Sequence, residues 1–399
     1  MSPWRREGGW LVGANVAQQA LGVVVLLWLA RNIAVDDWGR FALDAAVLGL
    51  VATFATARLN VLAVASSDAV WEGGLAQRVI AAMRTEAAAM LALGAAALVV
   101  LDRLELGPTL LVVGMAARHL AQQTRAVSER RGRFAPLARR ETAALIGGHA
   151  AAIACVFAGR PELALYLREA VLGLALAALL LPSLQRAGLV PRAAWLLGPR
   201  RFLDLAAHNP AAWLDGILEQ VFERVLVLVA GGVAGATGAG LFAQARGLAF
   251  RPHQLASPLT NRLSLGWLGR TPDAEERRRA VLTVARRAAL PLGGVALVTA
   301  LAAPAAVPWL LGEPWREAGR ALAWMAGFAG GVTLLEFAKA ALLVEGRVGD
   351  LARVRLAQLA GLGLGLASLA VLEPVAALGA ALSMATLAAV GSAYRRLAS

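Results

Sequence analysis

The chain has one cysteine, one lysine and few charged residues for its length of 399 residues. With Cys155 as the only thiol, an internal disulfide and a site built on several cysteines are excluded. Charged residues make up 16% of the sequence and hydrophobic residues 59%, whereas soluble domains carry about 25% charged residues. Lys339 is the only lysine, so the net charge of +13 comes from arginine, which we attribute to GC-rich codon usage. The composition therefore excludes an ordinary soluble domain.

Apolar stretches recur along the whole chain, each close to the roughly 20 residues that a helix needs to cross a bilayer. The connections between them are short and leave no room for a folded soluble domain. The first stretch carries Asn15, Gln18 and Gln19 and has no small-residue cleavage site, so we interpret it as a retained helix and not a signal peptide. The expected spans are residues 9–30, 41–64, 81–101, 108–125, 141–157, 163–181, 206–230, 237–265, 281–311, 321–344, 351–372 and 375–394.

Clusters of arginine fall in every second connection between these spans. They are Arg5 and Arg6, Arg78 and Arg84, the arginines between Arg118 and Arg140, those between Arg186 and Arg201, those between Arg270 and Arg287, Arg347, Arg353 and Arg355, and finally Arg395 and Arg396. This alternation follows the positive-inside rule and predicts that both termini are cytoplasmic. Orientation in a membrane, with contacts to anionic lipid headgroups, accounts for the positive charge without any nucleic acid.

Two halves of the chain resemble each other. The longest polar connection, residues 185–204, separates an N-terminal half, 1–184, from a C-terminal half, 205–399. Gly39 opens the second span as Gly240 opens the eighth, and the segments that begin at Gly132 and Gly346 share five residues at the same spacing. Six spans in each half make the repeats parallel. We predict an all-α membrane protein of about twelve helices, in two pseudo-symmetric six-helix bundles around a central cavity.

Ionisable residues within the spans are candidates for function, because burying a charge in a bilayer costs about 2.5–3.5 kcal/mol. Asp215, Glu219 and Glu223 are four residues apart and share one face of the seventh span. They are candidates for ion or proton coupling, as is Glu336 in the tenth span. The alternative is structural: the three carboxylates pair with Arg224 or with other helices, and Glu336 pairs with Lys339.

Cationic residues within the spans are candidates to bind an anionic group, because guanidinium groups hold phosphate through two hydrogen bonds. They are Arg246, Arg251, Arg58, Arg224 and Lys339. Arg246 shares a helical face with His253, and Gln18 and Gln19 are further candidates for the same cavity. The alternatives are a salt bridge from Arg246 to Glu219 or Glu223, and an interfacial position for Arg58.

No enzyme motif stands out in the sequence. His119, His149 and His208 have no metal-ligand spacing, and the glycine-rich run 231–240 lacks both the preceding strand and the Lys-Ser/Thr of a phosphate-binding loop. We find no Walker motif and no nucleophile elbow, and we expect no cofactor and no metal.

Several short segments resemble bacterial polysaccharide flippases. The segments are Leu29 to Arg31, Asp36 to Gly39, Phe41 to Leu43, Glu223 with Arg224, Gly238 to Arg246, Gly132 with Arg133, and Gly346 with Arg347. The chain departs from the family pattern at Trp38, where Phe is usual, and in the position of Phe41, which is shifted by one residue. The resemblance extends over nearly the full length and identifies the superfamily more than a substrate.

The resemblance implies a multidrug/oligosaccharidyl-lipid/polysaccharide exporter. Such a protein would carry a polyprenyl-diphosphate-linked oligosaccharide from the cytoplasmic to the periplasmic leaflet of the bacterial inner membrane by alternating access, for O-antigen, lipopolysaccharide or exopolysaccharide synthesis. The cations named above would hold the diphosphate headgroup. The implied partners are lipid-linked oligosaccharide, membrane lipids and a polysaccharide polymerase.

Three other functions stay open. A cation-coupled multidrug antiporter of the same superfamily would suit the acidic face of Asp215, Glu219 and Glu223, while the arginines count against it. A membrane polysaccharide polymerase or ligase would need a large periplasmic loop, which the sequence lacks. A scaffold without transport would not need charges in a cavity.

Overall fold

The chain is almost entirely helical. The computed structural model describes residues 3–57, 59, 63, 71–131, 133–186, 196–207, 210–257 and 273–398, and there is no strand among them. Helix satisfies every backbone polar group within its own segment, which a bilayer requires. The predicted all-α membrane fold is thus confirmed. Contacts divide the chain into two compact units, Met1–Ala14 with Leu43–Val225 and Asn15–Ala42 with Leu226–Ser399.

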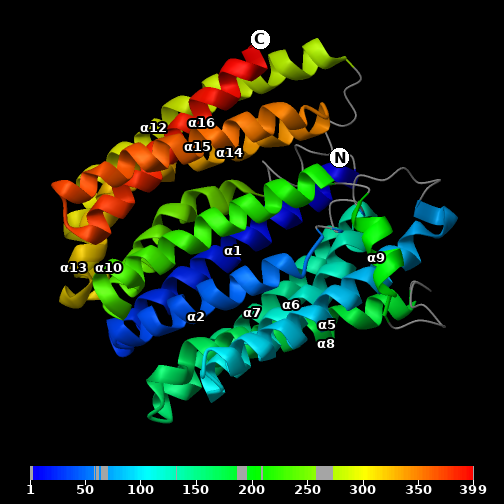
Figure 1. Ribbon diagram of the computed structural model, residues 1–399, viewed down its shortest axis with the longest axis horizontal. Coiled ribbons are helices and arrows are strands. Elements are labelled where there is room, and N and C mark those ends of the chain that lie inside the picture. The colour runs from blue at the N-terminus through cyan, green and yellow to red at the C-terminus, as the bar shows by residue number, and fades with distance from the viewer. Residues whose placement is uncertain are drawn as a thin grey trace. The chain divides into compact units, whose positions relative to one another are not determined.

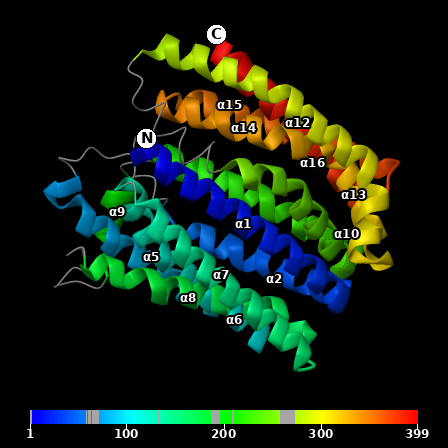
Figure 2. The same ribbon diagram turned by 180° about the vertical axis from the view of Figure 1, so that it is seen from behind.

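The first unit is a bundle around one central helix, α6. Its helices are α5 (Ala76–Val100), α6 (Leu106–Arg130), α7 (Phe134–Phe157) and α8 (Ala164–Arg186), with most of α2 (Val35–Phe54) and the beginning of α10 (Pro210–Ser257). Helix α6 packs along α8 and α5, and α7 packs along α8, as Figures 1 and 2 show. Short turns of helix, η1 (Trp71–Leu75) and η2 (Pro161–Leu163), precede α5 and α8.

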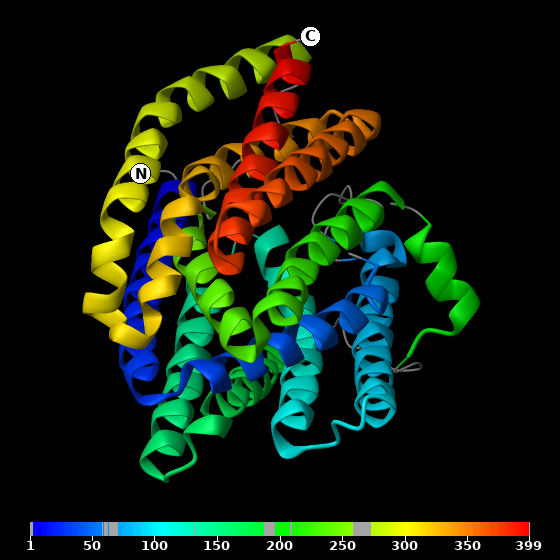
Figure 3. The same cartoon turned by 60° about the vertical axis from the view of Figure 1, so that its left-hand side comes forward.

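The second unit is arranged around α16. It contains most of α1 (Pro3–Asn32), the rest of α10, and α12 (Ala274–Leu311), η4 (Glu313–Trp315), α13 (Arg316–Trp324), α14 (Ala326–Val344), α15 (Val348–Leu366), η5 (Ala367–Ala370) and α16 (Pro374–Ala398). Helices α13, α14 and α15 all pack against α16, and α12 packs against α13 and α14. Figure 3 shows α12 bending along its length, and the helix contains Pro291, Pro304 and Pro308, each of which removes a backbone hydrogen bond.

Helix α10 consists of two segments joined at Gly235. This residue has φ +68° and ψ −171°, a conformation that only glycine adopts without strain. The break falls inside the run 231–240, where the sequence predicts a turn between the seventh and eighth spans. The two segments therefore correspond to those spans, and residues 258–265 of the predicted eighth span lie outside the described part.

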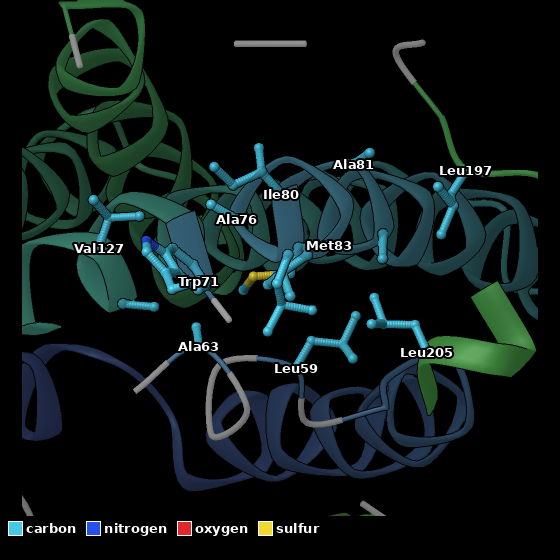
Figure 4. Close-up of a cluster of buried hydrophobic side chains, with 14 of the residues drawn as sticks. Leu59, Ala63, Trp71, Ala76, Ile80, Ala81, Met83, Val127, Leu197 and Leu205 are labelled. Atoms are coloured by element: carbon cyan, nitrogen blue, oxygen red, sulfur yellow. The ribbon is translucent and has the colours of Figure 1, made fainter. Parts of the chain in front are cut away.

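The connection between the predicted halves contains a helix that the sequence analysis missed. Helix α9 (Pro199–Ala206) follows Leu197, whose backbone N–H donates to the Thr85 hydroxyl at 2.7 Å. Leu197 and Leu205 are buried at one end of the apolar cluster drawn in Figure 4, which also contains Trp71 and Met83. Residues 187–195 lie outside the described part. The end of this connection is thus docked on α5, which holds it in place by apolar contacts.

Seven of the described helices are long and apolar enough to cross a membrane. They are Val12–Asn32, Ala76–Val100, Pro161–Leu184, Gly216–Ala256, Ala274–Leu311, Ala326–Val344 and Pro374–Ala398. Helix α6 is not among them, although it lies at the centre of the first unit, because polar side chains interrupt it. Three of these polar side chains, His119, Gln123 and Thr124, are buried inside the bundle.

The assignment of arginines to cytoplasmic connections is wrong for three of them. Arg84 lies inside α5 with 8% of its surface exposed, and Arg355 lies inside α15 with 6% exposed. Arg118 lies near the middle of α6 and forms an ion pair with Glu169 of α8. These arginines belong to helix packing, so they carry no information on orientation.

Candidate functional site

In the second unit, Arg251 belongs to a polar contact between α10 and α1. Its guanidinium donates to Gln19 Oε1 at 2.8 Å and to Gln254 Oε1 at 3.3 Å. On α1, Gly22 lies beside the guanidinium, and Asn15 donates to the backbone oxygen of Gln254 at 2.9 Å. The structure thus brings the predicted cation Arg251 together with Gln19, which the sequence analysis placed in the same cavity.

Arg246 and His253 lie on the same α10 segment. Arg246 is half-buried, and His253 is buried, with its Nδ1 atom 3.3 Å from the hydroxyl of Thr333 on α14. Phe250 packs against the ring of His253 and against Phe328 of α14. These contacts fix the segment of α10 that presents Arg246 and Arg251.

Lys339 and Glu336 form an ion pair within α14. The Lys339 ammonium donates to Glu336 Oε1 at 3.0 Å, and its side chain is only 4% exposed. The pairing is the structural alternative that the sequence left open. Because its charge is already balanced by a carboxylate, Lys339 is a weaker candidate for an anion than Arg251.

In the first unit, α10 carries the acidic face and Arg224. Glu219, Glu223 and Arg224 are all half-buried, whereas the side chain of Asp215 and all of Arg58 lie outside the described part. Arg224 reaches α2, where it donates to the backbone oxygen of Ala45 at 3.3 Å. A Cβ atom at Gly49 would lie 2.8 Å from the guanidinium, so the glycine makes room for this arginine.

The first unit also contains ion pairs between helices that the sequence analysis did not single out. His119 Nε2 lies 2.7 Å from Glu86 Oε2, joining α6 to α5, and Arg125 bonds Glu141 at 2.6 Å, joining α6 to α7. With the ion pair between Arg118 and Glu169, polar contacts link α6 to three neighbouring helices. The signal in the sequence was the polar run that makes α6 a weak span, in which His119 was interpreted as an isolated histidine.

In the second unit, two glycines that the sequence analysis compared between the predicted halves lie close together. A Cβ atom at Gly39 would lie 1.7 Å from the backbone oxygen of Ala236, and one at Gly240 would lie 2.6 Å from that of Val35. Trp38 packs edge-on against Trp315 at 5.8 Å between ring centroids. The start of α2 is therefore packed backbone-to-backbone against α10, and only glycine allows this approach.

Among the described residues, no group of three or more His, Cys, Asp or Glu side chains has a geometry that could hold a metal ion. Cys155 is buried in α7, where its thiol donates to the backbone oxygen of Arg160.

The two helical units, with charges buried inside their helices, define a multi-pass helical membrane protein. The structure is similar to a mutant of the Vibrio cholerae MATE transporter VcmN, with a TM-score of 0.66, 12% identity, and 98% of this chain and 95% of that chain covered. It is also similar to the eukaryotic MATE transporter AtDTX14, with a TM-score of 0.64, 12% identity, and 99% and 94% covered. A MOP superfamily transporter from Pyrococcus furiosus gives a TM-score of 0.63 at 14% identity, with 99% and 95% covered.

The family is shown by sequence. Residues 27–320 match the model of a family described as polysaccharide biosynthesis protein, so the chain belongs to that family. A search of curated proteins by sequence finds no match. Family and fold together confirm the polysaccharide and MOP exporter superfamily that the short motifs of the sequence resemble.

Proposed function

We propose that this protein moves a lipid-linked oligosaccharide, carried on a polyprenyl diphosphate, from the cytoplasmic to the periplasmic leaflet of a bacterial inner membrane. The observation that carries the proposal is the combination of a polysaccharide biosynthesis family with a transporter fold. Polysaccharide biosynthesis requires enzymes that build the polymer and carriers that move its intermediates across the membrane. The fold is that of transporters, which favours the carrier over a polymerase or ligase.

The geometry around Arg251 supports an anionic headgroup. Its guanidinium is oriented by two amide side chains, Gln19 and Gln254. A diphosphate oxygen accepts hydrogen bonds from guanidinium more strongly than a neutral amide does, because both partners are charged. The substrate can therefore replace the amides at Arg251. Arg246, five residues earlier, lies on a different face of the helix and is a separate candidate cation. The lipid tail would stay in the bilayer.

Arg224, Arg58 and Lys339 are assigned smaller roles in this proposal. Arg224 reaches toward α2 of the first unit, and Lys339 is balanced by Glu336. Both are suited to later contacts during a transport cycle, and Arg58 stays a candidate from the sequence alone. Glu336, Glu219, Glu223 and Asp215 stay candidates for ion coupling.

A cation-coupled multidrug antiporter is the second candidate. Glu219 and Glu223 are half-buried one turn apart on α10, and carboxylates in a span attract cationic compounds. Structures similar to this one include MATE transporters. The family match to polysaccharide biosynthesis places this function second.

The test measures lipid-linked oligosaccharide in a strain that lacks the protein. Mass spectrometry gives its amount, and accessibility to a membrane-impermeant reagent gives its side of the membrane. We expect the lipid-linked oligosaccharide to accumulate on the cytoplasmic face, and wild-type protein to relieve this accumulation. Arg251→Ala and Arg246→Ala should restore transport at least tenfold less, which corresponds to about 1.4 kcal/mol. Arg279→Ala is the matched control, because Arg279 is exposed near the start of α12. Normal amounts and sidedness in the deletion strain would contradict the proposal and favour the antiporter.

A further inference from the structure

A carboxylate and an imidazole are buried together inside the first unit. Glu86 is 1% exposed near the middle of α5, and His119 is 6% exposed near the middle of α6. The Oε2 atom of Glu86 lies 2.7 Å from the Nε2 atom of His119. Ionisable groups placed this deep in a membrane protein are costly, and carboxylate–histidine arrangements there commonly relay protons.

The same carboxylate holds the end of α2. The helix ends at Phe54, well inside the span predicted for residues 41–64, and Ala57 follows with its backbone N–H free of the helix. That N–H donates to Glu86 Oε1 at 2.6 Å. The backbone oxygen of Thr56 accepts from the indole N–H of Trp213, on the first segment of α10. Any change in the charge of Glu86 or His119 therefore acts directly on the point where α2 is interrupted.

A neutral amide completes the polar group. Gln123 lies one turn beyond His119 on the same face of α6 and is 1% exposed. Neither its oxygen nor its nitrogen has a hydrogen-bond partner among the described residues. An amide can accept from a protonated ring nitrogen and can donate to a bare one, so Gln123 is suited to either protonation state. A buried amide without a partner is costly in a purely structural core.

The charged neighbours of the pair on α6 are paired with other helices, and one buried arginine lies close by on α5. On α6, Arg118 is paired with Glu169 of α8 and Arg125 with Glu141 of α7. Arg84, on α5 itself, is buried two residues before Glu86. The described residues from Thr53 to Ala57, at the end of α2 and just beyond it, include no charged side chain, and Asp204 of α9 is exposed. The ionisable groups that contact each other at this position are Glu86 and His119, with Arg84 the nearest buried cation along α5.

We propose that Glu86 and His119 form a proton-binding site, with the proton taken up on His119 and its release coupled to movement of the end of α2. With His119 neutral, the buried pair carries one negative charge, and with His119 protonated it carries none. The site lies apart from Asp215, Glu219, Glu223 and Glu336. As a coupling site it rests on the proposed transport function, whereas as a proton-binding site it does not.

Proton binding is tested on the full-length protein without any substrate. The histidine rings are labelled with ¹⁵N in detergent-purified protein, and His119→Gln identifies the His119 signal among the four histidines. We expect that ring to bind and release a proton within the pH range in which the protein stays folded. In Glu86→Gln this change should occur at a different pH, because the carboxylate partner is removed. If Glu86→Gln does not fold, Glu86→Asp serves instead. Because it keeps the carboxylate, it should alter the pH of the His119 change less than removal of the carboxylate would.

The matched control is Glu141→Gln, which removes a half-buried carboxylate from the same unit without touching the pair. In this variant, the His119 ring should change its protonation form at the same pH as in wild type. A His119 ring that keeps one form over the whole range would overturn the proposal. So would a Glu86→Gln variant in which the change does not move.

Coupling is tested in proteoliposomes loaded with lipid-linked oligosaccharide from the deletion strain. An imposed pH difference should raise the flux through wild type and Glu141→Gln several-fold, and should have no effect on Glu86→Gln or His119→Gln. Equal stimulation of all four proteins would overturn the coupling role. An absence of flux in wild type at every pH would instead sink the proposed function, and the proton site would then be decided by the histidine titration alone.

Discussion

The two units differ in how far polar contacts join their helices. In the first unit, ion pairs connect α6 to α7 and α8, and a hydrogen bond between Glu86 and His119 connects it to α5. In the second unit, the contacts of Lys339 with Glu336 and of Arg355 with Gln358 stay within one helix, while Asp350 and Arg396 join the beginning of α15 to the end of α16. Both units also contain close glycine contacts: a Cβ atom at Gly365 of α15 would lie 2.3 Å from the Cα atom of Ala381 on α16, and one at Gly173 of α8 would lie 2.1 Å from the backbone oxygen of Gly114 on α6.

Polar contacts and glycine contacts are two ways of joining helices inside a membrane. Lipid tails are as apolar as leucine, so burying apolar side chains does not by itself drive helices together in a membrane. Helices then associate through close backbone approach at small residues or through polar contacts between them. Ion pairs are specific but respond to protonation, whereas glycine contacts do not. In each unit, a change of pH can therefore act only on the contacts that contain ionisable groups, such as Asp350 with Arg396 in the second unit.

The largest effect is expected where a glycine contact is blocked. Gly365→Ala places a methyl group against the backbone of α16, which cannot move aside as a side chain would, and should lower the free energy of unfolding by about 3 kcal/mol. Gly363→Ala is the matched control, because nothing lies within 4 Å of a Cβ atom there. Thermal unfolding in detergent measures both, and equal melting temperatures for the two variants would refute a packing role for Gly365.

A smaller loss is expected from breaking an ion pair of the first unit. Glu169→Gln leaves Arg118 of α6 without its charged partner on α8. Loss of one partner of a fully buried pair costs about 3–5 kcal/mol, but Arg118 is 39% exposed, so we expect about 2 kcal/mol. The double variant Arg118→Met with Glu169→Leu should recover most of this loss, since it removes both charges. If the double variant had a lower free energy of unfolding than Glu169→Gln, the unpaired charge of Arg118 would not explain the loss in the single variant.

Periodicity and charge predicted most of the architecture. The predicted spans correspond to described helices because length and apolar content decide which segments enter a bilayer. Helix α9 could not be predicted in this way, since its stability comes from contacts of Leu197 and Leu205 with α5. The ends of helices were also misplaced: α2 begins at Val35, six residues before the predicted start at Phe41, because its acidic first turn was interpreted as a loop.

The candidate site was less accessible to sequence reasoning. Spacing along one helix was enough to predict the ion pair of Lys339 with Glu336, because both residues are on α14. Spacing could not predict the contact of Glu86 with His119 or of Arg118 with Glu169, because these partners come from different helices. No local pattern in the sequence encodes which helix faces meet. The contact of Arg251 with Gln19 is of the same kind, with α1 and α10 more than two hundred residues apart.

The glycine contact of α2 with α10 should be weaker than that of α15 with α16, because it lies near the beginnings of helices, which can shift. Gly240→Ala meets the backbone oxygen of Val35 and should cost about 1–2 kcal/mol. Hydrogen exchange of residues 35–42 should become faster than in wild type. Gly247→Ala, on the same helix with nothing within 4 Å, serves as control. Unchanged exchange in Gly240→Ala would show that the two glycines do not hold the start of α2.

The smallest effect is expected at the beginning of α15, where Asp350 joins two helices of the second unit by charge. The pKa of Asp350 is held below its usual value chiefly by the hydrogen bond from Arg347, with Arg396 of α16 adding to it. The ionised form thus stabilises the folded protein. This contribution is complete above the usual value of 3.8 and is lost as the pH falls through the lower pKa of the folded state.

Asp350→Asn should therefore lower the free energy of unfolding by about 0.5–1 kcal/mol at neutral pH, the range of partly exposed pairs. The difference from wild type should disappear as the pH falls below 3.8. Glu317→Gln, at an exposed carboxylate of α13, should show no such dependence. Melting curves of the three proteins over a pH series measure this. A constant difference at all pH values would mean that Asp350 stabilises α15 by hydrogen bonding alone, and that charge links helices only in the first unit.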